Sequence, residues 1–161
     1  MEKNLGELGR YIDAHREEML DLWERLVNTE SGPAQREGVS NVIALLREEM
    51  EQAGIASRVI QVEGEVGDIL VGEWNGEAPK APILFIGHTD TVFPPGEAER
   101  NPFRISGEGL AYGPGVLDMK GGLVIALYAV KALAYAGFRD RPIKFVLVGD
   151  EETMHKSSNA K

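Results

Sequence analysis

The 161-residue sequence contains no cysteine. Disulfide bonds and thiolate metal ligands are therefore excluded, which fits a reducing cytoplasm. The longest apolar stretch, residues 122–137, is interrupted by Lys131 and is too short to cross a bilayer. The first residues lack the apolar core and the cleavage site of a secretion signal. We therefore expect a soluble, cytoplasmic protein with no membrane partner.

Positive charge is also scarce, with 17 Lys and Arg against 26 Asp and Glu and a formal net charge of −9. No cluster of Lys and Arg interrupts this acidic pattern. Such a surface repels phosphate backbones, so we expect no nucleic-acid partner. The composition, 43% hydrophobic and 27% charged, is typical of a folded globular protein. The length is enough for one domain with a hydrophobic core.

Apolar spacing predicts mainly helices in the first third of the chain. Apolar residues recur every three or four positions from Leu5 to Leu26. This spacing predicts one long helix, with His15 in a structural position on its apolar stripe. The pattern stops at the breakers of residues 31–33. A second helix is predicted from about Val39 to Ala53, with Gly54 as its left-handed cap.

Strand patterns dominate the rest of the chain. Residues 83–87 and 143–149 are short, continuous and apolar, which predicts strands covered on both faces. A helix at about residues 119–136 joins them, so we predict parallel neighbours in an α/β sheet. Ligands bind outside the carboxyl ends of such strands, so the residues that follow the two strands should share one edge. Further strands are predicted at residues 57–62 and 68–74, and a small hairpin at residues 103–112.

Ligand-type side chains follow both apolar strands. Side-chain alternation places His88 and Asp90 on the same side of the chain, as for a metal-ligating histidine with an orienting acid. The second strand is followed by three adjacent acids, residues 150–152, which repel one another unless a cation offsets them. Taken singly, the first motif also fits a loop histidine beside a turn-forming Asp, and the second a solvated acidic turn.

A third segment, Tyr112-Gly-Pro-Gly-Val-Leu-Asp118-Met-Lys-Gly-Gly122, lies between the two strands. It lacks the Gly-Lys-Ser/Thr of a phosphate loop, and alone Asp118 fits an acid that starts a helix. Together, however, His88, Asp118, Glu151 and Glu152 supply the imidazole, the carboxylates and the general base that a two-metal hydrolytic site needs. The residues themselves predict a metal-assisted hydrolase and leave its substrate open.

The wording of these motifs resembles the dinuclear zinc exopeptidase family, which includes glutamate carboxypeptidases, aminoacylases and succinyl-diaminopimelate desuccinylases. The three motifs occur in the family's order, and Tyr112-Gly-Pro-Gly is most similar to the glutamate carboxypeptidases. The resemblance implies a three-layer α/β/α catalytic domain with a mixed, largely parallel sheet. It also implies two zinc ions. The target would be an amide or peptide bond in a small N-acyl amino acid or C-terminal glutamate substrate.

The resemblance also assigns roles to residues of this sequence. His88 would be a terminal ligand of one zinc, Glu152 would bind the second zinc, and Asp118 would bridge both. Glu151 would be the general base that takes a proton from the bridging water. Asp90 would orient His88. The family further implies a cis peptide bond between Asp118 and Met119.

The resemblance places residues 1–161 in the N-terminal part of the family's catalytic domain. The sequence lacks a further acidic ligand, a late histidine, the later strands and the lid domain through which the family forms homodimers. Each zinc would keep two protein ligands, so we expect the isolated chain to be inactive. His155 could replace a missing ligand, although a surface position fits it better.

Two alternatives stay open. The chain could be a catalytically inactive, truncated module that binds a metal or a partner weakly. It could instead be a different metal-dependent phosphohydrolase, which no phosphate-binding motif supports. In the favoured interpretation its partner is a small-molecule or peptide substrate.

Overall fold

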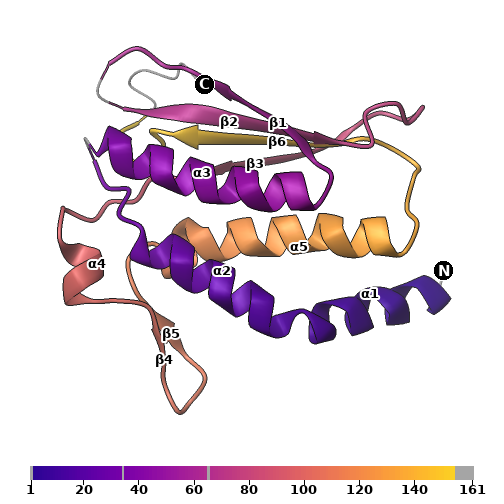
Figure 1. The fold of residues 1–161 in the computed structure, drawn as a ribbon, viewed down its shortest axis with the longest axis horizontal. Helices are drawn as coiled ribbons and strands as arrows, with labels where there is room; N and C mark the ends of the chain where they lie inside the picture. The colour runs from indigo at the N-terminus through magenta and orange to yellow at the C-terminus, as the bar shows by residue number, and fades with distance from the viewer. Residues whose placement is uncertain (1, 34, 65, 155–161) are drawn as a thin grey trace.

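The computed structural model describes residues 2–33, 35–64 and 66–154. Its main feature is a four-stranded sheet in the order β1-β2-β6-β3, with β1 at Ala56–Ile60, β2 at Gly67–Trp74, β6 at Ile143–Gly149 and β3 at Ile83–His88. The helices lie on one side of this sheet (Figure 1). Within the described residues, no helix is long and apolar enough to cross a membrane.

The long N-terminal helix predicted from the apolar stripe is two helices, α1 (Glu2–Ala14) and α2 (Arg16–Asn28). The break lies at His15, whose φ of −107° and ψ of 17° are not helical. Its ring Nδ1 lies 2.7 Å from the carbonyl oxygen of Tyr11, so the side chain competes for the carbonyl that the helix itself uses. The bend lets both helices pack against α5 (Gly121–Tyr135).

The parallel pairing of β3 with β6 is confirmed, and α5 provides the helical connection between them. The mixed α/β sheet is confirmed as well. In the described part of the chain, however, β3–β6 is the parallel pair, while β1–β2 and β2–β6 are antiparallel. The sheet is therefore not largely parallel here, because β1 and β2 form a hairpin whose second strand runs against β6.

The core lies between the sheet and the helices α3 (Arg36–Gln52) and α5. Alternate residues of the strands point into it, as expected for a sheet with one buried face. Buried side chains that form this core include Leu22, Leu26, Val42, Leu46, Met50, Leu70, Leu127, Tyr128, Ile143, Phe145 and Leu147.

The opposite face of β3 is open, and the prediction that β3 is covered on both faces is wrong for the described residues. Leu84 is 51% exposed and Ile86 is 70% exposed. The physical reason is position, since β3 is the last strand of the sheet and the described helices cover the other face. The third layer implied by the family resemblance has no member among the described residues.

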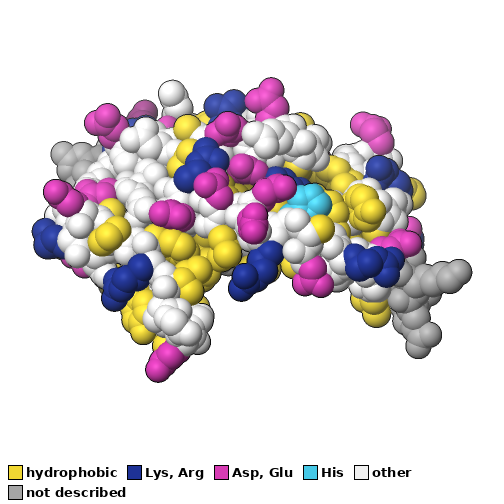
Figure 2. Space-filling view, turned by 60° about the horizontal axis from the view of Figure 1, so that its bottom comes forward, with side chains coloured by type: hydrophobic (Ala, Val, Ile, Leu, Met, Phe, Trp, Pro, Cys, Tyr) yellow, Lys and Arg dark blue, Asp and Glu magenta, His cyan; other side chains and the backbone are white. Residues whose placement is uncertain are grey.

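The remaining elements connect β3 to α5. They are α4 (Glu97–Arg100), the hairpin of β4 (Arg104–Ile105) and β5 (Ala111–Tyr112), and the irregular helical segment η1 (Val116–Lys120). The predicted hairpin is confirmed and turns at residues 106–109. Figure 1 shows it projecting away from the sheet. On the face seen in Figure 2, acidic side chains are widespread and Lys and Arg lie scattered among them, without one basic patch.

Candidate metal centre

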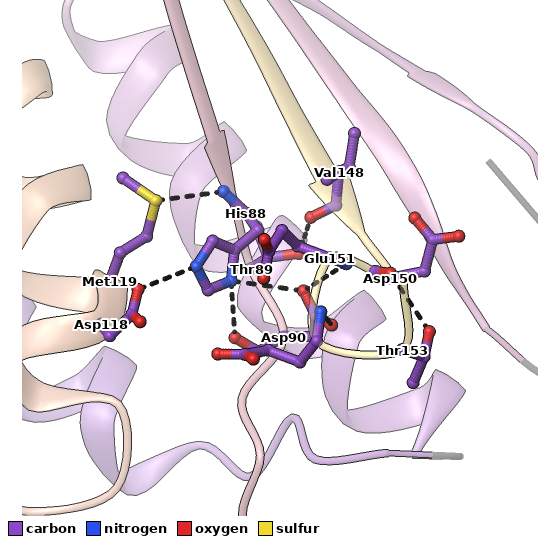
Figure 3. Close-up of polar contacts among 10 residues, drawn as sticks. His88, Thr89, Asp90, Asp118, Met119, Val148, Asp150, Glu151 and Thr153 are labelled. Atoms are coloured by element: carbon purple, nitrogen blue, oxygen red, sulfur yellow. Dashed lines mark hydrogen bonds and ion pairs between the residues drawn. The ribbon is translucent and has the colours of Figure 1, made fainter. Parts of the chain in front are cut away.

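The carboxyl ends of β3 and β6 lie side by side, because His88 pairs in register with Val148. The N–H of Thr89 continues the pairing by donating to the carbonyl oxygen of Val148 at 2.8 Å. The residues that follow the two strands are therefore neighbours, as the strand pattern predicted. Figure 3 shows them gathered at this edge of the sheet together with Asp118.

His88 is 6% exposed and is held at three points. Its backbone N–H donates to the sulfur of Met119 at 3.3 Å, on the side of β3 away from β6. Its ring Nδ1 lies 3.0 Å from the carbonyl oxygen of Asp90, and its Nε2 lies 3.0 Å from Oδ1 of Asp118 (Figure 3). The ring therefore presents Nε2 toward a carboxylate at the surface.

The protonation of His88 follows from these contacts. Burial lowers the pKa of His88, but hydrogen bonds with Asp90 and Asp118 outweigh burial and raise the pKa to about 9. The metal-free chain thus favours a charged imidazolium between two acids. A metal ion that binds Nε2 must displace a proton first, so metal binding should become stronger as the pH rises toward 9.

Asp118 comes from η1, and the peptide bond between Asp118 and Met119 is cis, as the resemblance implied. The segment is held against α2, where the indole Nε1 of Trp23 donates to the carbonyl oxygen of Val116 at 3.1 Å. Gly115 has φ of 70°, and a Cβ there would lie 2.6 Å from the methyl carbon of Thr91. The Asp118 side chain itself is 76% exposed and free to reach an ion.

Asp90 is buried and connects the two strand ends. Its Oδ1 accepts the backbone N–H of Glu151 at 3.2 Å, and its Oδ2 accepts that of Glu152 at 2.9 Å. Oδ1 also lies 3.3 Å from Nδ1 of His88. Hydrogen bonds to a charged acceptor are the stronger kind. One carboxylate thus fixes both the His88 ring and the turn that carries the Glu-Glu pair.

Three of the predicted residues form one cluster. His88, Asp118 and Glu152 each offer one ligand atom, and these atoms lie within 4.8 Å of one another. Burial raises the pKa of Glu152, and the charge of His88 lowers it. The negative charges of Glu151 and Asp118 raise the pKa of Glu152 further. Such repulsion between carboxylates is what a bound cation relieves.

The donor set fits a divalent metal of the zinc type, since one imidazole nitrogen and two carboxylate oxygens are among its usual ligands. Ligand atoms about 2.1 Å from a tetrahedral zinc ion are about 3.4 Å apart. The ligand atoms, which lie within 4.8 Å of one another, therefore need to approach by at most about 1.4 Å to enclose an ion. Glu151 directly precedes Glu152 in the sequence. Its side chain is exposed and is not a member of this cluster.

Sequence reasoning missed two supporting residues. The sulfur of Met119 fastens the end of β3, and the side chain of Lys120 is buried beneath the Asp118 segment. No sequence signal separates this lysine from an exposed one at a helix start. His155 falls outside the described residues. His15 makes its contacts within the α1–α2 helix pair and not at the cluster, in keeping with the structural position predicted for it.

The fold matches solved structures of peptidases. The di-peptidase Dug1p from Saccharomyces cerevisiae aligns with a TM-score of 0.80 and 18% identity over 95% of this chain and 36% of its own. Human carnosine dipeptidase 1 aligns with a TM-score of 0.73 and 20% identity over 92% of this chain and 35% of its own. These likenesses show that the chain has the fold of these peptidases, with a His-Asp-Glu cluster at the ends of its strands.

Sequence comparisons find similarity to one peptidase family. Residues 84–161 match the model of peptidase family M20/M25/M40. Carboxypeptidase G2 from Pseudomonas sp. (strain RS-16) is 36% identical over 130 residues, which are 80% of this chain and 31% of that protein. A succinyl-diaminopimelate desuccinylase from Rhodopseudomonas palustris (strain BisB5) is 35% identical over 76% of this chain and 33% of its own length. The chain is thus similar to this peptidase family over residues 84–161, and it spans about a third of the length of these relatives.

Proposed function

We propose that residues 1–161 form the N-terminal part of the catalytic domain of a zinc-dependent hydrolase. Its reaction is cleavage of an amide or peptide bond in a small N-acyl amino acid or C-terminal glutamate substrate. The observation that carries this proposal is the cluster of His88, Asp118 and Glu152 at the carboxyl ends of β3 and β6. The names of the relatives support the reaction class, since they describe a carboxypeptidase and a desuccinylase.

The cluster residues have distinct roles in this proposal. His88 and Asp118 would hold one zinc ion, and Asp118 and Glu152 would hold a second. When bound, zinc would polarise the amide carbonyl and lower the pKa of a water molecule. Glu151, exposed beside the cluster, accepts the proton of the attacking water and passes it to the leaving amine. Asp90 keeps His88 and the Glu-Glu turn in place through the hydrogen bonds described above.

We propose that the complete activity belongs to a protein longer than this chain. The chain spans about a third of its relatives, so the remaining zinc ligands, the lid domain and the homodimer contact would come from further sequence. A cytoplasmic location agrees with the lack of cysteine. The alternative is an inactive module that binds metal or a partner weakly, which the small number of clustered ligands also supports.

Zinc calorimetry on the 161-residue chain tests the site. We expect zinc binding that Asp118→Ala abolishes and His88→Ala weakens, because each variant removes a ligand atom from the cluster. His15→Gln serves as the matched control, since His15 contacts the α1 backbone and not the cluster. Binding that survives Asp118→Ala unchanged would exclude the proposed cluster as the metal site.

An activity assay then separates the two functions. Turnover of an N-acyl glutamate by the zinc-loaded chain, abolished by Glu151→Gln with zinc still bound, would favour the hydrolase in this chain itself. Zinc binding without turnover would favour the module, or a site completed by further sequence. The same Glu151→Gln change in a longer protein that contains this chain distinguishes those two outcomes.

A further inference from the structure

Lys120 is an ionisable side chain in the interior of the molecule. It is 1% exposed, and it lies two residues after Asp118, directly before α5. Its Nζ donates a hydrogen bond to the carbonyl oxygen of Thr29 at 2.7 Å. The chemistry proposed above gives this lysine no part, although a buried charge is costly unless it is paired.

The partner of Lys120 is the end of α2. Thr29 is the residue that caps this helix, where backbone carbonyls lack partners inside the helix. A cation at a helix C-terminus is stabilised by the helix dipole. The negative charge of Glu30, the next residue, also acts on Lys120 favourably. The amino group of Lys120 therefore lies at the end of α2, where a backbone carbonyl oxygen accepts its hydrogen bond.

The same short segment after α2 also holds the other half of the site. The carbonyl oxygen of Ser31 accepts the backbone N–H of Thr91 at 2.9 Å, and Thr91 directly follows Asp90. The side chain of Thr91 in turn lies against Gly115, where a Cβ would come within 2.6 Å of its methyl carbon. Residues 29–31 are therefore a common anchor for the loop after β3 and for the segment that carries Asp118.

The Asp118 segment is fixed on both sides of the ligand. Before Asp118, the indole of Trp23 holds the carbonyl oxygen of Val116. After Asp118, Lys120 reaches Thr29. Between these two fastened points the exposed Asp118 carboxylate lies 3.0 Å from Nε2 of His88.

We propose that Lys120 is a positioning residue of the metal centre. Its hydrogen bond to the end of α2 holds the Asp118 carboxylate within reach of His88 and Glu152. Lys120 touches neither metal nor substrate and acts only through the backbone of its segment. The proposal rests on the proposed function, because it gives Asp118 the role of a metal ligand.

The two tryptophans of the sequence provide a test that needs no metal. The indole N–H of Trp23 donates to Val116 and reports on the Asp118 segment, while Trp74 stacks on Phe138 and reports on the rest of the fold. In Lys120→Met with a chelator present, we expect exchange of the Trp23 indole proton to be faster by about tenfold, with the Trp74 signal unchanged. Lys144→Met, which removes a half-buried lysine of β6 that lies away from the Asp118 segment, should change neither signal.

Zinc calorimetry completes the test. Lys120→Met should weaken zinc binding by about tenfold or more, while Lys144→Met leaves it unchanged. Unchanged Trp23 exchange together with unchanged zinc affinity would overturn the role of Lys120. If the wild-type chain binds no zinc, the three clustered residues do not form a metal site by themselves, and Trp23 exchange still decides whether Lys120 holds the segment. If Lys120→Met also loses the Trp74 signal, Lys120→Gln replaces it, with the same outcomes deciding.

Discussion

The charge of His88 makes a quantitative prediction for the metal-free chain. Its pKa is about 9 in the folded chain, against an ordinary value of 6.5. The folded state therefore holds this proton more tightly than the unfolded state does. The stabilisation is fully present below pH 6.5 and is lost as the pH rises through 9. Each pH unit between the two pKa values corresponds to about 1.4 kcal/mol, so about 3 kcal/mol should be lost.

The measurement needs a variant, because Lys120 titrates in the opposite sense. Burial lowers the pKa of Lys120 to about 7 from 10.5, with Glu30 opposing the shift. Its protonated form therefore destabilises the fold at low pH, and this cost disappears as the pH rises from 7 toward 10.5. Wild type and His88→Gln share this effect, so it cancels in their difference.

The assay is urea unfolding of both proteins with a chelator, at several values from pH 6 to pH 9.5. The free energy of unfolding of wild type minus that of His88→Gln should fall by about 3 kcal/mol across this range. A difference that stays flat with pH would show that Asp90 and Asp118 do not hold His88 in its charged form. A difference that rises would contradict the sign of the argument.

Two further predictions concern the support of the site. Asp90→Asn leaves an amide –NH₂ facing a backbone N–H of the Glu-Glu turn, so unfolding free energy should fall by about 1–3 kcal/mol and zinc affinity should drop. Urea unfolding and calorimetry measure both, and unchanged zinc affinity would remove Asp90 from its positioning role. Gly149→Ala places a Cβ 2.8 Å from the carbonyl oxygen of Asp68 and from Gly67, which should cost about 1–3 kcal/mol. Gly9→Ala is the control and should be neutral or stabilising, because nothing outside the adjacent backbone of its own helix lies within 4 Å of the added Cβ, and equal effects would contradict the crowding.

Much of the site's location could be predicted from local patterns. Two apolar runs with a long helical connection predicted the parallel pair β3–β6, and the pair places His88 and Glu152 at one edge. The breakers and spacing also indicated the small hairpin. Such features depend on nearby residues and on the general handedness and edge rules of α/β sheets.

Features that depend on distant contacts could not be predicted. The bend at His15 leaves the apolar stripe intact, so hydrophobic spacing alone does not show it. The exposed face of β3 depends on which elements reach that side of the sheet, and an apolar run reads the same whether it is covered or open. Burial of Lys120 depends on the end of α2, which lies 91 residues earlier in the chain.

The hydrogen bonds of Asp90 link the metal centre to the pairing register of β3 and β6. A slip of β3 against β6 by one residue would turn the His88 side chain to the other face of the sheet and pull Asp90 away from the amides of the Glu-Glu turn. The three ligands meet only when the strands are paired in the native register. Zinc in the refolding buffer would then stabilise the native strand pairing over alternative pairings. It would raise the yield of correctly paired chains without contacting the hydrophobic core.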